Sequence, residues 1–341
     1  MSSVAGEPIP RGVAYGDLAY VSGPGGELLL LHVSSGDIVA RTSFAARALA
    51  ADAAGVIGWR SGPGTTDQRG EFGVILFAAQ LATDSVEVVW EARLDFPAWV
   101  GGSASDVSRF AMDAQIEAGV VKVTVAAYSR YQGGAAPPMA VEAAATRELH
   151  RVVRLDRQSG GVLTGDRIDQ SPATRTLLDE PIPGRRPVPY QYAETPQTRT
   201  WSTATGRAQL VRGPEGSGVH LARAVTASSA PPVEMVLSED ARSRTMVSLD
   251  GRWVFAEQTP GHGAPWGMYS AESGECVGDV VLDEGTISVA VIGGSVLLLV
   301  KEVASTAVRW TLRCRDRTDS RERWSLLLEE RADRSAPPLS R

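Results

Sequence analysis

The segment around His262 offers the best residues for catalysis in this sequence. It reads Gly261-His262-Gly263-Ala264-Pro265-Trp266, with a glycine on each side of the histidine. An imidazole could act as a general acid or base near neutral pH, and Trp266 could line the same pocket. The same pattern also fits a hairpin whose tryptophan packs on a neighbouring sheet. We take His262 as the candidate catalytic residue and keep packing as the alternative.

A proline-rich segment, Gln170 to Arg199, carries side chains suited to contact a partner. Proline cannot donate a ladder hydrogen bond, so we expect this segment to lie over one face of the fold rather than in a central strand. Tyrosine and arginine dominate binding hot spots, and an arginine pair could also hold an anion. The predicted partner- or ligand-binding residues are Arg185, Arg186, Tyr190, Tyr192, Trp99 and Trp266.

Other sequence motifs of catalysis are missing. No Gly-x-x-x-x-Gly-Lys, His-Glu-x-x-His or Gly-x-Ser-x-Gly is present. The four histidines, His32, His150, His220 and His262, are scattered, and no Cys-x-x-Cys pair exists, so we expect no metal site. His32 lies in an apolar run, which favours a strand residue satisfied by a neighbour.

The charge balance disfavours nucleic acid as a partner. Lysine and arginine number 34 and aspartate and glutamate 40, so the net charge is −6, and no long basic run is present. The first twelve residues have neither a cationic start nor an apolar stretch, and the longest apolar run is too short to span a membrane. We therefore expect a cytoplasmic protein that contacts no membrane.

Apolar residues come in short runs with the spacing of strands. These runs are rich in Val, Leu, Trp and Thr and end at Gly, Asp, Ser or Pro, which predicts an all-β fold. Only Ala140 to His150 could form a helix, and it could equally be a loop. We expect less than about a tenth of the chain in helices.

A tight turn between two strands recurs along the chain. A Ser-Gly or Thr-Gly pair ends each turn at Gly36, Gly160, Gly206 and Gly274. Degenerate copies of the turn occur at Thr83-Asp84-Ser85 and Thr318-Asp319-Ser320. Glycine takes the positive-φ position there and the hydroxyl bonds to local backbone. Three of the five spacings between these turns, 48, 46 and 46 residues, match a structural repeat of about 40 to 50 residues. The two longer spacings, 76 and 68 residues, hold either an insertion or an extra repeat.

These copies resemble the PQQ-repeat (quinoprotein-like) β-propellers, and Ser248-Leu249-Asp250-Gly251 resembles a turn of several propeller families. The resemblance implies four-stranded antiparallel blades in a closed ring. Seven blades of about 49 residues fit the length best, with six as the alternative. Ring closure should join the N-terminal strands to the last blade. We expect an N-terminal extension at 1–12, the propeller at 13–330 and a flexible tail at 331–341.

The sequence departs from the pattern of this family at the repeat tryptophan and at the cysteines. The family tryptophan stands four residues after the turn glycine, and only Trp90 and Trp324 approximate that position. The quinone enzymes also use adjacent cysteines, whereas Cys276 and Cys314 are far apart. We therefore expect no cofactor, and no disulfide between these cysteines.

Two functions remain open. The leading hypothesis is a non-catalytic scaffold that presents loops to a protein or peptide partner, because a propeller is a rigid disc and cofactor signatures are missing. The alternative is a lyase, hydrolase or cyclase that acts on a small molecule or peptide in the central channel, with His262 as its catalytic group.

Overall fold

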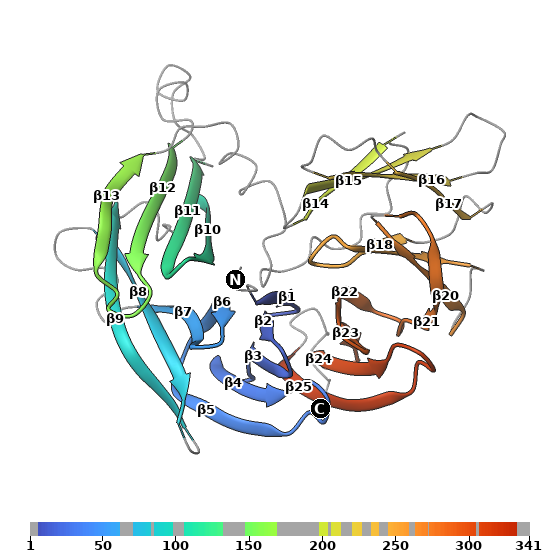
Figure 1. Cartoon of the computed structure of the whole chain (residues 1–341), viewed down its shortest axis with the longest axis horizontal. Coiled ribbons are helices and arrows are strands. Elements are labelled where there is room, and N and C mark those ends of the chain that lie inside the picture. Colours follow the sequence, from blue (N-terminus) through green and yellow to red (C-terminus); the bar gives the residue numbers. More distant parts are fainter. Residues whose placement is uncertain are drawn as a thin grey trace, which may run out of the picture.

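The chain folds as a β-propeller, a ring of antiparallel sheets that follow one another in chain order (Figure 1). The computed structural model describes residues 6–61, 71–82, 85–97, 106–131, 147–168, 198–203, 206–212, 220–226, 233–238, 245–258, 263–271, 273–304 and 307–332. These residues form six sheets, which we number blades 1 to 6, and contain no helix. The expected all-β fold is confirmed.

Blades 1 to 3 make up the first half of the ring. Blade 1 has five strands and the other two have four, each paired with its neighbours in chain order. The strands are β1 (Glu7–Ile9), β2 (Gly12–Tyr15), β3 (Leu18–Ser22), β4 (Glu27–His32) and β5 (Ile38–Ala45) in blade 1; β6 (Arg47–Asp52), β7 (Gly55–Ser61), β8 (Glu71–Leu81) and β9 (Val86–Pro97) in blade 2; and β10 (Asp106–Glu117), β11 (Val120–Tyr131), β12 (Arg147–Asp156) and β13 (Val162–Ile168) in blade 3.

Blades 4 to 6 make up the second half of the ring, with four strands each. The strands are β14 (Thr198–Thr203), β15 (Gly206–Arg212), β16 (His220–Thr226) and β17 (Val233–Ser238) in blade 4; β18 (Thr245–Val247), β19 (Trp253–Glu257), β20 (Pro265–Ser270) and β21 (Cys276–Val281) in blade 5; and β22 (Thr286–Ile292), β23 (Ser295–Val303), β24 (Ala307–Asp316) and β25 (Glu322–Ala332) in blade 6.

The continuous apolar runs of the sequence are middle strands that are covered on both sides. In β4, Leu28 and Leu30 pack towards blade 2, whereas Leu31 packs towards blade 6. Successive side chains of a strand point to opposite faces, so a blade between two neighbours needs apolar residues at every position. The run Val296 to Val300 in β23 splits in the same way between blades 5 and 1.

The expected count of seven blades is not confirmed, and two local predictions need correction. The described residues hold six sheets, so the seventh expected blade is not among them. The helix considered at 140–150 is wrong for residues 147–150, which begin β12. The sheets also extend beyond the expected boundaries, since β1 lies inside residues 1–12 and β25 ends at Ala332.

The recurrent turn is present in four blades. It joins the last two strands of each of these blades, which are the third and fourth of its four regular strands when β1 is left out of blade 1. We call these segments the outer turns: His32–Gly36, Asp156–Gly160, Ser270–Gly274 and Asp316–Ser320. In each, the amide of the fifth residue donates to the carbonyl of the first, at 2.8–3.0 Å. The fifth residue has positive φ, at 77°, 69°, 76° and 59° in chain order. The prediction is wrong for Gly206, which starts β15 and follows the first strand of blade 4.

Tryptophans dock onto outer turns of the next blade. Trp90 of β9 donates its Nε1–H to the carbonyl of Arg157 at 2.9 Å, and its ring lies against Gly160. A Cβ on Gly160 would come within 2.6 Å of that ring, so glycine is required there both by its φ of 69° and by this close approach. The two residues that approximated the family tryptophan in the sequence therefore mark the contacts between blades.

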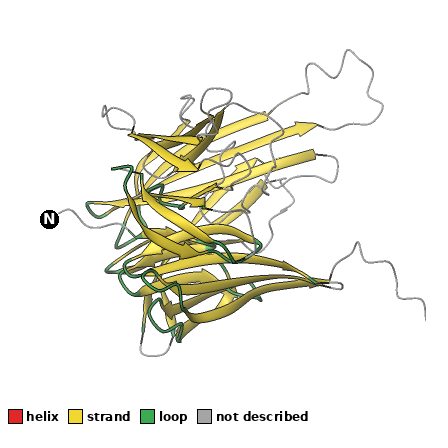
Figure 2. Ribbon diagram, turned by 90° about the vertical axis from the view of Figure 1, so that its right-hand side faces the viewer, coloured by secondary structure: helices red, strands yellow, loops and turns green. Residues whose placement is uncertain are grey.

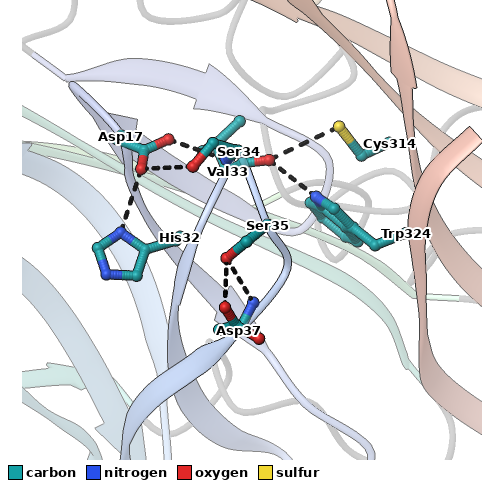
Figure 3. A network of polar contacts seen from close by, with 8 residues as sticks. All are labelled: Asp17, His32, Val33, Ser34, Ser35, Asp37, Cys314 and Trp324. Carbon is teal, nitrogen blue, oxygen red and sulfur yellow. Dashed lines mark hydrogen bonds and ion pairs between the residues drawn. The ribbon is translucent and has the colours of Figure 1, made fainter.

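The ring closes when blade 6 docks onto blade 1. Trp324 of β25 and Cys314 of β24 both donate to the carbonyl of Val33, at 2.8 and 3.6 Å (Figure 3). Side chains of the two blades share one apolar cluster. The N-terminal strands thus meet the last blade, as expected, but by packing: β1 pairs with β2 in blade 1 and not with a strand of blade 6.

Candidate functional site

The two faces of the disc carry different connections. In every blade the first and third hairpins of the four regular strands lie at one face, which we call the turn face. The second hairpins and the links between blades lie at the other, the loop face. Viewed edge on, most described turns gather at one end of the strands (Figure 2). The four longest segments between strands, 62–70, 98–105, 132–146 and 169–197, all begin and end at the loop face.

Most of the predicted site residues lie outside the described residues, but their flanking strands are informative. The residues concerned are Trp99, Arg185, Arg186, Tyr190, Tyr192 and His262. The strand ends that flank their segments are Pro97 and Asp106, Ile168 and Thr198, and Glu257 and Pro265. All of these ends lie at the loop face, so the sequence-predicted residues belong to connections of one face.

Trp266 is the one predicted contact residue that the structure describes. Its side chain is 4 % exposed and belongs to the apolar cluster between blades 5 and 6, together with Met268 and Phe255. The ring therefore packs in the core between these two blades. This position matches the packing alternative that the sequence left open.

His32 is held by a polar network at the turn face (Figure 3). The Asp17 carboxylate accepts hydrogen bonds from the amide and hydroxyl of Ser34, both at 2.8 Å, and lies 3.1 Å from His32 Nδ1. Partial burial opposes ionisation of Asp17, but the Ser34 bonds and His32 outweigh it and lower its pKa. The Ser34 hydroxyl bonds to Asp17 and not to the imidazole, so this network fixes the outer turn of blade 1.

A group of cationic and aromatic side chains lies at the loop face where blades 1 and 6 meet. Arg11, in the turn between β1 and β2, pairs with Glu329 of β25 at 2.6 Å. Arg331 also pairs with Glu329. The guanidinium carbons of Arg11 and Arg331 lie 5.7 and 5.5 Å from the centre of the Trp310 ring. Burial opposes ionisation of Glu329, but the two arginines outweigh it and lower its pKa.

Arg47 extends this group across to blade 2. It is the first residue of β6, and its guanidinium lies over the Trp59 ring at 5.6 Å. Although Arg47 is exposed to solvent, desolvation and the charge of Arg11 lower its pKa, and Glu329 offsets this only in part. We call Arg11, Arg47 and Arg331 the arginine cluster. Their sequence positions give no hint of it, because only ring closure brings the first and last strands together.

The part of the chain that the structure describes offers no cluster of metal ligands and no membrane-spanning helix. No group of three His, Cys, Asp or Glu residues there could hold a metal ion. No helix among these residues is long and apolar enough to cross a bilayer. Both cysteines are free: Cys276 is exposed on β21, and Cys314 is buried on β24, where burial raises the pKa of its thiol.

Comparison with known proteins gives only distant likenesses. No protein-family model matches the sequence, and no curated protein matches it. Similar solved structures include BamB from Moraxella catarrhalis, with 11 % identity, TM-score 0.25, and coverage of 98 % of this chain and 92 % of that chain. The dihydro-heme d1 dehydrogenase NirN has 14 % identity and a TM-score of 0.32, and the match covers 96 % of this chain and 67 % of that chain. Sqt1 from Saccharomyces cerevisiae has 8 % identity and a TM-score of 0.24, and the match covers 95 % of this chain and 88 % of that chain. At these scores the assignment of the fold rests on the six sheets themselves.

Proposed function

We propose that this propeller is a binding module that presents its loop face to a protein partner. The observation that carries the proposal is the asymmetry of the disc, since its four longest connections all begin and end at one face. Connections of this kind on a rigid scaffold are where binding residues concentrate. The predicted contact residues Arg185, Arg186, Tyr190 and Tyr192 all belong to the longest of them.

The scaffold that carries these connections is held together by contacts within and between its blades. The outer turns are closed by backbone hydrogen bonds, and tryptophans lock neighbouring blades at two seams. A pre-organised surface loses less conformational entropy when it binds. We propose that the module acts without a bound cofactor and that it is cytoplasmic, as its sequence predicted.

Affinity capture with matched variants tests this function. In one variant Arg185→Ala and Arg186→Ala remove two cations from the longest loop-face connection. In the control, Arg41→Ala and Arg321→Ala remove the same charge from exposed positions on the outer strand β5 and at the turn face. The first variant should lose its specific partner and the control should keep it, with both melting temperatures close to that of wild type.

Two outcomes would contradict the proposal. One is partner capture that survives in the loop-face variant and fails in the control. The other is a chain that turns over a small molecule and loses this turnover on His262→Ala, which would instead favour the enzyme hypothesis.

A further inference from the structure

We infer that the arginine cluster receives an acidic segment of the protein partner, bound through its carboxylates. This inference rests on the proposed function, because it names the chemistry of the partner at the same loop face. The cluster lies at the seam where blades 6, 1 and 2 meet and combines residues from β25, the β1–β2 turn and β6.

The first support is an imbalance of charge within the cluster. Arg11 and Arg331 share a single carboxylate, that of Glu329. Among the described residues no carboxylate forms an ion pair with Arg47, which is exposed and feels the like charge of Arg11. Among the described residues, the ion pairs of this three-arginine cluster thus involve one carboxylate, on a chain whose net charge is −6. An incoming carboxylate would relieve the repulsion between Arg11 and Arg47.

The second support is the way in which the guanidinium groups are held. Arg47 lies over Trp59, and Arg331 and Arg11 lie over Trp310. An arginine that stacks on an aromatic ring keeps N–H donors at its edge for a bidentate carboxylate. The stacking also limits the motion of the long side chain, so less entropy is lost on binding.

An acidic protein segment fits this surface better than a nucleic acid does. A polyphosphate backbone needs a wide cationic track, whereas this cluster is confined to one seam of an acidic molecule. Trp59 and Trp310 are only partly buried, so apolar side chains next to the acidic residues of a partner would also find contact area.

The probe is a fluorescein-labelled hexaglutamate peptide, titrated with the full chain and followed by fluorescence polarisation. Wild type should bind it at low ionic strength and more weakly as salt is added. The variant Arg47→Gln with Arg331→Gln should bind about tenfold or more weakly. The control Arg41→Gln with Arg321→Gln changes the net charge equally and should bind as wild type does.

Equal binding by both variants would overturn the inference, and so would a wild-type chain that prefers a labelled oligothymidylate of the same length. The result is separable from the proposed function. If partner capture requires residues 169–197 but is unchanged by Arg47→Gln with Arg331→Gln, the binding module stands and the acidic partner is wrong. If hexaglutamate binds as expected but no protein contacts the loop face, the proposed function fails by itself.

Discussion

Replacing Gly160 by alanine tests whether tryptophan docking holds the blades together. Gly160 has a φ of 69°, and a Cβ there would lie 2.6 Å from Cδ2 and Cε3 of Trp90. Two costs therefore add. Placing an L-residue in the left-handed region costs roughly 1–2 kcal/mol. Displacing the buried indole costs about 1–3 kcal/mol for overpacking, and about 1 kcal/mol for its hydrogen bond to Arg157.

The matched control is Gly119→Ala in the same blade. Gly119 has a φ of 79°, but a Cβ there would meet no atom within 4 Å. This variant should therefore cost only the roughly 1–2 kcal/mol of backbone strain. We expect Gly160→Ala to lower the free energy of unfolding by about 2–4 kcal/mol more than Gly119→Ala does, in urea denaturation followed by circular dichroism.

A double-mutant cycle isolates the contact itself. Trp90→Leu removes the ring that the new methyl group would strike, so Gly160→Ala should cost no more in this background than Gly119→Ala. Equal costs for the two alanine variants in the wild-type background would refute the docking argument. A Gly160→Ala penalty that persists in full with Trp90→Leu would do the same.

Three further predictions concern other parts of the ring. Asp52 of blade 2 and Arg157 of blade 3 form an ion pair, and their side chains are 15 % and 9 % exposed. Asp52→Ala leaves Arg157 unpaired and should lower the free energy of unfolding in urea by about 3–5 kcal/mol. A loss below about 1 kcal/mol would refute this prediction. Burial raises the pKa of Asp113 from 3.8 to about 6, although the Ala114 amide and the charge of Lys122 act in the opposite direction. The protonated carboxyl therefore stabilises the native state in full below pH 3.8, and this stabilisation is lost as the pH rises through 6. Asp113→Asn should therefore gain stability relative to wild type between these pH values, and a constant difference in melting temperature would contradict the assignment. A thiol reagent should label Cys276 in the native chain and Cys314 only after unfolding, as peptide mass spectrometry can check.

The regular parts of the fold could be predicted from local patterns. Glycine at positive φ leaves a clear mark at Gly36, Gly160 and Gly274, because few other residues tolerate that conformation. Gly206 shows the limit of this reasoning. A Thr-Gly pair has the same local chemistry in the first hairpin of a blade as in the third, and only strand pairing tells them apart.

Contacts between distant residues could not be predicted in this way. The arginine cluster joins Arg11 to Glu329 over nearly the whole chain, and nothing in the spacing of these residues marks the pair. Burial of Trp266 likewise depends on blade 6, which follows it in the sequence. Charged and aromatic residues of a propeller acquire their roles only when the ring closes.

Site-specific photo-crosslinking tests the central claim, that the loop face binds a protein partner, most directly. A photoreactive amino acid is placed at position 190, in the longest loop-face connection, and separately at position 318, in the exposed outer turn of blade 6. After irradiation in the producing cells, position 190 should yield one recurrent crosslinked protein, and position 318 should yield none. Recovery of the same protein from position 318, with nothing from position 190, would contradict the account.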